Sequence, residues 1–120
     1  MKGRYLFDDM AFTAEYRTYV EEHLSEAAPV QVRPMFGGLG IYSDGLFFAL
    51  VDEDKLYLKV SELNQADFEA AGMEPFVPWP GAKPMGYWEL PAAVLESPED
   101  LKVWVDKALA VAESKRKSKK

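Results

Sequence analysis

The sequence predicts an α+β domain in which helices pack against an antiparallel sheet. Two apolar runs, residues 39–43 and 46–51, are separated by Asp44-Gly45. This dipeptide is typical of a tight hairpin, because both central residues of a type I′ turn need positive φ. Apolar residues spaced three and four apart indicate helices on either side of the hairpin. Helices that flank a set of antiparallel strands give the α+β class.

The first helix is expected to begin at Asp8, whose side chain can cap its first turn. Phe7 and Phe12 would then form a hydrophobic staple across the cap. Pro29 and Pro34 bracket the exit from this helix. The apolar positions that define its buried face are Phe12, Tyr16, Tyr19, Val20 and Leu24.

Two further helices are indicated by their terminal residues. Ser61 opens a short helix that runs to Ala71, and Gly72 suits the left-handed position after its end. Ser97 caps the last helix, with Pro98 in its first turn. The buried stripe of this last helix is predicted to contain Leu101, Trp104, Val105, Ala108, Leu109 and Ala112.

The strands are expected between these helices. Residues 55–60 return after the acidic turn 52–54, and two more strands are predicted near residues 75–79 and 86–90. The predicted order is therefore helix, three strands, helix, two strands, helix. Gly37, Gly38 and Gly40 lie inside an apolar strand signal, which indicates a bulge or a close approach by another backbone or a ligand.

Pairing the strands through both turns gives a sheet with two apolar faces. If Ser43 faces Leu46 and Asp52 faces Lys55, alternate residues share a face. One face then carries Gly40, Tyr42, Phe47, Ala49, Val51, Leu56, Leu58 and Val60. The other carries Leu39, Ile41, Leu46, Phe48, Leu50, Tyr57 and Lys59. Either helices cover both faces or a partner covers one, and a homodimer through the face with Phe48 and Lys59 is the simplest arrangement.

Length and charge limit the function classes. The 120 residues suit one domain, residues 1–114, followed by a basic tail, residues 115–120, that we expect to be disordered. The tail has five basic residues, and residues 1–114 carry 9 basic and 20 acidic side chains, a net charge of −11. A body so acidic repels phosphate, so we expect no specific DNA binding by the folded part. Without a signal peptide or a membrane span, the expected location is the cytoplasm.

Candidate catalytic and metal-binding residues are scarce. The chain has no cysteine and one histidine, His23. Glu22, His23 and Glu26 could hold a metal weakly on one helix face, but a solvated helix face explains them better. No Gly-x-Ser-x-Gly elbow and no pair of buried carboxylates is apparent. We therefore predict no enzyme activity, no metal and no cofactor.

Candidate binding residues are basic and aromatic. Lys59 on an apolar face could hold an anionic group, or it could cover apolar surface with its stem. Arg33 could contact an acidic partner or form a surface ion pair. Trp79, Tyr87 and Trp88 flank a loop rich in proline and glycine, where they could form a binding cleft or pack beneath the loop.

Several segments together resemble the N-terminal domain of the TfoX/Sxy family. They are residues 33–42 (RPMFGGLGIY), 48–51 (FALV), 56–59 (LYLK), 68–76 (FEAAGMEPF) and 86–91 (GYWELP), and the likeness spans about residues 8–112. The resemblance implies an α+β fold related in topology to secretion chaperones. It also implies regulation of natural competence in bacteria, together with the cyclic-AMP receptor protein. Those regulators carry a second, C-terminal domain that this chain does not show.

Two functions follow from the sequence. One is a non-enzymatic regulatory module, a transcription or competence co-regulator that acts through protein partners. The other is a small-molecule-binding domain with an aromatic pocket near Tyr87 and Trp88.

Overall fold

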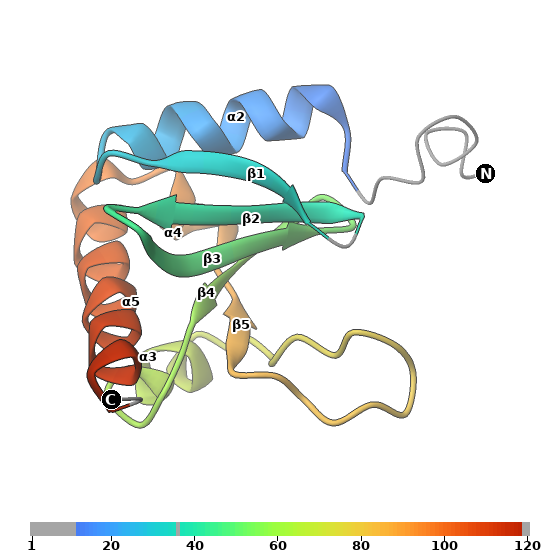
Figure 1. Ribbon diagram of the computed structural model, residues 1–120, viewed down its shortest axis with the longest axis vertical. Helices are drawn as coiled ribbons and strands as arrows, with labels where there is room; N and C mark the ends of the chain where they lie inside the picture. The colour runs from blue at the N-terminus through green and yellow to red at the C-terminus, as the bar shows by residue number, and fades with distance from the viewer. Residues whose placement is uncertain (1–11, 36, 119–120) are drawn as a thin grey trace.

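The computed structural model describes residues 12–35 and 37–118, which form one antiparallel sheet with helices packed on it (Figure 1). The five strands are adjacent in chain order, β1-β2-β3-β4-β5. The elements are α2 (Ala14–Ser25), β1 (Gln31–Met35), β2 (Gly38–Ser43), β3 (Leu46–Asp52), β4 (Lys55–Lys59), α3 (Gln65–Ala70), β5 (Tyr87–Glu89), α4 (Ala92–Leu95) and α5 (Pro98–Ser118). None of the helices in these ranges is long and apolar enough to cross a membrane.

The predicted fold class and hairpin are confirmed. Every pair of neighbouring strands is antiparallel. Asp44 and Gly45 have φ values of 51° and 81°, as the predicted β2–β3 turn requires. Glu53 and Asp54, with φ values of 55° and 54°, make a second turn of this kind between β3 and β4. Short turns therefore fix the order of the three central strands.

The outer strands differ from the prediction. Residues 31–35 form β1, where the sequence indicated only the exit from a helix. Pro34 is compatible with a strand here because β1 lies at the sheet edge, where a missing N–H costs little. The strand predicted at residues 75–79 is absent, and only a single bridge joins Pro75 to Trp88. Pro78 and Pro80 have no N–H with which to extend that pairing.

The helix starts also differ from the prediction. The described part of the first helix, α2, begins at Ala14, and the Thr13 hydroxyl accepts a hydrogen bond from the Tyr16 backbone N–H (3.1 Å). Phe12 therefore precedes the helix, whereas the predicted cap Asp8 and its neighbour Phe7 lie outside the described residues.

For the later helices, the predicted start of α3 is wrong, but the predicted end of α3 and the predicted cap of α5 are confirmed. The helix predicted from Ser61 begins four residues later, after a turn, and α4 was not predicted. The left-handed Gly72 (φ 75°) is confirmed, with the Met73 N–H donating to the Phe68 carbonyl (2.9 Å). The cap of α5 is also confirmed, because the Asp100 N–H donates to the Ser97 hydroxyl (3.3 Å).

A β-bulge between β2 and β3 overturns the predicted division of the two sheet faces. Tyr42 pairs with Phe47 but Ile41 pairs with Ala49, so Phe48 is an extra residue in β3. Beyond the bulge, Leu39 pairs with Val51 and shares its face, which the uninterrupted register does not allow. The glycine run predicted a bulge or close approach, and both occur. A Cβ on Gly38 would collide with the Val51 carbonyl oxygen.

The main core lies between one face of the sheet and the helices (Figure 1). Trp104 of α5 packs edge-on against Phe68, with ring centroids 4.7 Å apart. Phe48 is fully buried in this core and does not share a face with Lys59. The expectation that Phe48 lies on a surface open to a partner is therefore wrong. We call this face the helix-covered face and the opposite one the open face.

Candidate functional site: an apolar groove on the open face

A groove of about 730 Å³ lies between the open face and the loop of residues 75–86. Its volume falls within the range of typical ligand sites, about 300–1,000 Å³. The sheet contributes Met35, Gly38, Leu39, Phe47, Leu50, Val51 and Asp52. The loop contributes Phe76, Pro78, Trp79, Ala82, Lys83 and Met85. The lining is apolar apart from one carboxylate and one ammonium group.

Backbone hydrogen bonds hold the loop beside β5. The Phe76 N–H donates to the Tyr87 carbonyl (2.6 Å), and the Met85 N–H donates to the Phe76 carbonyl (2.8 Å). The Phe76 ring also packs on Tyr57 of β4, with centroids 4.8 Å apart. These contacts fix both sides of the loop, so the groove is built into the fold.

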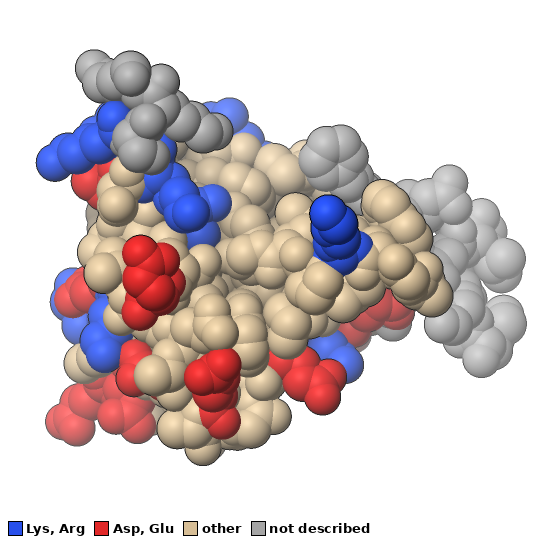
Figure 2. Space-filling view, turned by 90° about the horizontal axis from the view of Figure 1, so that it is seen from below, with Lys and Arg blue, Asp and Glu red and all other residues tan. Residues whose placement is uncertain are grey.

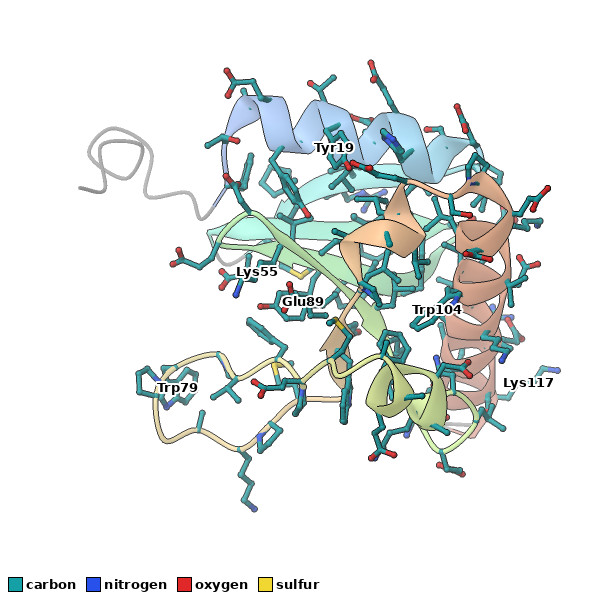
Figure 3. The ribbon with its side chains drawn as sticks, turned by 180° about the vertical axis from the view of Figure 1, so that it is seen from behind. Tyr19, Lys55, Trp79, Glu89, Trp104 and Lys117 are labelled. Carbon is teal, nitrogen blue, oxygen red and sulfur yellow. The ribbon has the colours of Figure 1, made fainter. Side chains whose placement is uncertain are left out.

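The loop exposes apolar side chains. Trp79 is 66% exposed and Met85 is 41% exposed. Figure 3 shows Trp79 at the far end of the loop, whereas Trp104 lies on α5 against the core. Figure 2 shows a broad uncharged area between scattered charged side chains on one side of the molecule. Large exposed apolar side chains beside a groove are characteristic of an interaction surface.

Gly40 allows the groove floor to form. A Cβ at this position would lie 2.8 Å from the Met35 methyl carbon and 3.3 Å from a Phe47 ring carbon. Because Gly40 has no side chain, Met35 and Phe47 come together across β2. The glycine run predicted from the sequence as a place of close approach thus shapes the groove as well as the sheet.

A row of aromatic and basic side chains crosses the open face beside the groove. The rings of Tyr42 and Phe47 stack at 5.0 Å, and those of Phe47 and Tyr87 lie 5.5 Å apart. The Lys59 ammonium is 4.6 Å from the Tyr87 ring centroid and donates a hydrogen bond to its hydroxyl (2.8 Å). The Arg33 guanidinium lies 5.3 Å from the Tyr42 ring centroid. We call these five residues the cation–aromatic row.

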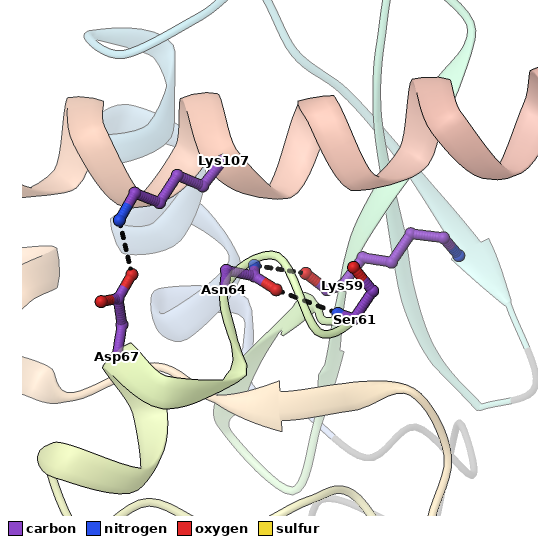
Figure 4. Close-up of polar contacts among 5 residues, drawn as sticks. All are labelled: Lys59, Ser61, Asn64, Asp67 and Lys107. Atoms are coloured by element: carbon purple, nitrogen blue, oxygen red, sulfur yellow. Dashed lines mark hydrogen bonds and ion pairs between the residues drawn. The ribbon is translucent and has the colours of Figure 1, made fainter.

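Lys59 is positioned by a buried asparagine that follows β4 (Figure 4). The Asn64 side-chain amide donates to the Lys59 carbonyl (3.1 Å), and its oxygen accepts from the Ser61 N–H (2.9 Å). Asn64 is only 3% exposed, so both hydrogen bonds are made out of water. They fix the end of β4 and, with it, the place where the Lys59 side chain starts.

Burial raises the pKa of two tyrosines on the open face, Tyr57 and Tyr87. Burial, followed by the proximity of the Tyr42 hydroxyl, raises the pKa of Tyr87 to about 12. Burial, followed by the Glu89 carboxylate and the acids of the β3–β4 turn, raises the pKa of Tyr57 to about 12. Both phenols are neutral near neutral pH, as an ordinary tyrosine is, and the raised pKa extends this state to higher pH.

The structure brings together some of the predicted binding residues and separates others. Arg33, Tyr57, Lys59 and Tyr87 share the open face. Trp88 points to the other face, where it packs against the core and 6.3 Å from the Phe68 ring. Consecutive strand residues face opposite sides, so a single pocket formed by Tyr87 and Trp88 is ruled out.

Several groove residues were not predicted from the sequence. Met35, Phe76 and Met85 come from three separate segments, and none has a motif that marks it as a binding residue, whereas Leu50 was placed on the sheet face expected to meet a partner. The sequence feature that pointed to the groove was the proline- and glycine-rich loop with Trp79. It predicted a cleft at the loop, but it did not identify the sheet residues that form the opposite wall.

The remaining polar residues give no reactive arrangement in the described ranges. His23 is held on α2, where a ring nitrogen contacts the Tyr19 carbonyl (2.8 Å) and the two rings lie 4.4 Å apart. In residues 12–35 and 37–118, no group of three His, Asp or Glu side chains could hold a metal ion. The chemistry that the open face supports is therefore recognition of apolar and charged groups.

Comparison with known families gives a match that covers most of the chain. The sequence profile of the TfoX N-terminal domain matches residues 22–112, which extend from α2 into α5 and include the whole sheet. No curated protein matches the chain well enough to count as a relative.

Proposed function

The chain belongs to the TfoX N-terminal domain family, and we propose that it is a non-catalytic binding module that docks an apolar segment of a protein partner in the groove. The observation that carries the proposal is the apolar groove of about 730 Å³ on the open face. The walls of the groove are already ordered in the free protein, so binding a partner does not cost the conformational entropy of ordering them.

The groove edge favours a protein segment as the occupant. Trp79 and Met85 are large and exposed, and both line the groove. Tryptophan and methionine are enriched in protein interfaces, and a few such residues usually provide most of the binding energy. A flexible thioether also adapts to different partner side chains. These features go beyond what is needed to enclose a small molecule.

We extend the proposal to regulation. Members of the TfoX/Sxy family act in competence together with a transcription factor, and docking a partner segment suits a co-regulator of this kind. The net charge of −11 over residues 1–114 disfavours direct contact with DNA phosphates. The role proposed for this chain is therefore to bind protein, with any DNA contact made by the partner.

A small-molecule ligand is the second candidate, because the groove volume suits one. A second copy of the chain is a third possible occupant, which would make the protein a homodimer. Both compete with the partner segment for the same surface, so one set of variants can separate them.

The test uses a displayed peptide library, selected on the wild-type protein and measured on two variants. Leu50→Asp places a carboxylate in the groove, and Val103→Asp is its control on the exposed side of α5. Selected peptides should bind Leu50→Asp at least about tenfold more weakly, and Val103→Asp within about twofold. Circular dichroism confirms that both variants are folded.

Equal peptide affinity for wild type and Leu50→Asp would contradict the groove as the docking site. Failure to select any peptide, with saturable binding of apolar small molecules, would favour the second candidate. Sedimentation of the wild type at high concentration tests the homodimer, which Leu50→Asp should dissociate.

A further inference from the structure

Trp79 is a large side chain of the groove wall that packs little against the rest of the fold. It lines the groove, yet it is 66% exposed, at the far end of the loop of residues 75–86 (Figure 3). Within residues 12–35 and 37–118, its indole N–H has no acceptor and its ring contacts no other aromatic ring and no cation. The side chain therefore offers both apolar area and a hydrogen-bond donor to a ligand in the groove.

The backbone at Trp79 is held by a tight turn. The Ala82 N–H donates to the Trp79 carbonyl (3.0 Å), and Gly81 has a φ of 87°. Pro80 at the second position and a left-handed glycine at the third are the pattern of a type II turn. Pro78 restricts the main chain on the other side of Trp79. Only the side-chain torsions of Trp79 remain to be ordered when a ligand binds, which costs little conformational entropy.

The indole N–H distinguishes between the possible occupants of the groove. In the free protein, water can satisfy this donor because the side chain is exposed. When a ligand covers the ring, a donor left without an acceptor costs free energy. A purely apolar small molecule offers no acceptor, whereas a peptide main chain offers a carbonyl oxygen at every residue. Trp79 therefore favours a peptide over a hydrocarbon-like ligand.

We propose that Trp79 anchors the docked segment through its side chain and its main chain. The indole packs over an apolar side chain that lies in the groove against Phe47 and Leu50, and the indole N–H donates to a main-chain carbonyl of the segment. The proposal rests on the proposed function and names the chemistry of the partner, an extended apolar peptide. A helix suits this contact less well, because its interior carbonyls already accept from its own N–H groups. Exposed tryptophans in such positions are typical binding hot spots.

The first test measures the affinity of peptides selected on the wild-type protein. Trp79→Ala removes the ring and the N–H, so it should weaken binding at least about tenfold. Trp79→Phe keeps an aromatic ring but has no N–H, so it should weaken binding about three- to tenfold. Both variants should be as stable as the wild type in urea denaturation, because the side chain is exposed.

Val77→Ala is the matched control variant. Val77 is an exposed apolar residue of the same loop, but it does not line the groove. Peptide affinity for Val77→Ala should stay within about twofold of the wild type. If Val77→Ala weakens binding as much as Trp79→Ala, the effect is not specific to Trp79 and the proposal is wrong.

The second test locates the main-chain acceptor. Amide bonds of a selected peptide are replaced one at a time by ester bonds, whose carbonyl oxygens are weaker acceptors. At one position the ester should weaken binding to the wild type about threefold or more, and change binding to Trp79→Phe little. Such coupling shows that the two groups interact. If no ester position depends on the indole, Trp79 does not bind the main chain and the proposal is wrong.

Fluorescence reports the position of the indole directly. The chain has three tryptophans, so the Trp79 part of the emission is the difference between the wild type and Trp79→Phe, both saturated with peptide. Peptide binding should shift this part to shorter wavelength and reduce its quenching by iodide. An unchanged spectrum would show that the ring stays in water, contrary to the proposal.

Leu50→Asp separates this proposal from the function on which it rests. If Leu50→Asp abolishes peptide binding but Trp79→Ala binds within about twofold of the wild type, the groove is the docking site and the role of Trp79 is wrong. If Leu50→Asp has no effect, or if no peptide is selected, the docking function is wrong and the anchor with it.

Discussion

The two faces of the sheet use the same strands for different purposes. On the helix-covered face, Ile41, Phe48 and Leu58 are completely buried and belong to the hydrophobic core. The open face instead combines half-buried apolar side chains with the Lys59 ammonium and the exposed Trp79 across the groove. Complete burial of one face supplies stability, which leaves the side chains of the other face free to serve recognition.

The β-bulge determines which residues of β3 lie on each face. With one extra residue, Phe48 and Ala49 both enter the core, while Phe47 and Leu50 line the groove on the other side. An uninterrupted strand would place Phe48 and Leu50 on the same face. The difference between the faces therefore depends on a local irregularity that the glycine-rich β2 accommodates.

The largest effect is expected when the core side of the bulge is truncated. Phe48→Ala should lower the free energy of unfolding by about 3–5 kcal/mol, because it leaves a cavity in a fully packed region. Leu50→Ala, two residues away in the groove, should lower it by about 1 kcal/mol, since Leu50 is only partly buried. Urea denaturation measures both. Equal losses would mean that the two faces contribute alike to stability.

The second effect concerns the two glycines of β2. In Gly38→Ala the new Cβ meets the Val51 carbonyl of the neighbouring strand, so we expect a loss of about 1–3 kcal/mol. In Gly40→Ala it meets the flexible end of Met35, which can move aside, so the loss should be smaller. The Gly40 variant should instead alter the groove, seen as a change in the part of the tryptophan fluorescence that Trp79→Phe removes, because the chain has three tryptophans. A larger loss of stability at Gly40 would contradict this distinction.

The sequence predicted the fold better than it predicted the site. The Asp44-Gly45 turn, the end of α3 at Gly72 and the cap of α5 at Ser97 are local features, and each is confirmed. They depend on a few neighbouring residues whose conformational preferences are strong. Together they were enough to give the α+β class.

The face assignments failed for a physical reason. Phe48 was assigned to the open face because alternation was carried through β3 without a bulge, and a bulge changes the face of every residue beyond it. Glycines in a strand indicate that a bulge is possible, but they do not identify the residue of the neighbouring strand that is the extra one. Likewise, Met35 and Phe76 meet only through the tertiary fold, so no local pattern could pair them.

The free energy of unfolding at high pH should show how a buried tyrosine hydroxyl contributes to stability. The pKa of Tyr57 is raised from 10.0 to about 12, so between these values the folded chain keeps a proton that the unfolded chain has lost. The free energy of unfolding should therefore be constant below pH 10 and fall as the pH rises toward 12, by about 1–2 kcal/mol for this residue. Tyr57→Phe should show a shallower fall in urea denaturation. An identical pH dependence in the variant would contradict the assignment.

The smallest effect is expected at the surface of the helix-covered side. Lys107 of α5 donates to Asp67 of α3 at 2.8 Å, and both side chains are substantially exposed. Exposed ion pairs contribute about 0–1 kcal/mol, so Lys107→Met should change the free energy of unfolding by less than about 1 kcal/mol. Peptide binding should be unaffected. A loss comparable to that of Gly38→Ala would show that α3 depends on this contact.

The central claim is that partners bind the open face, and mapping a bound peptide by amide hydrogen exchange tests it most directly. A peptide selected on the wild-type protein should slow exchange in β3 and in the loop of residues 75–86. Exchange in α2 and α5 should change little. Protection confined to α2 or α5, with β3 and the loop unchanged, would contradict the claim.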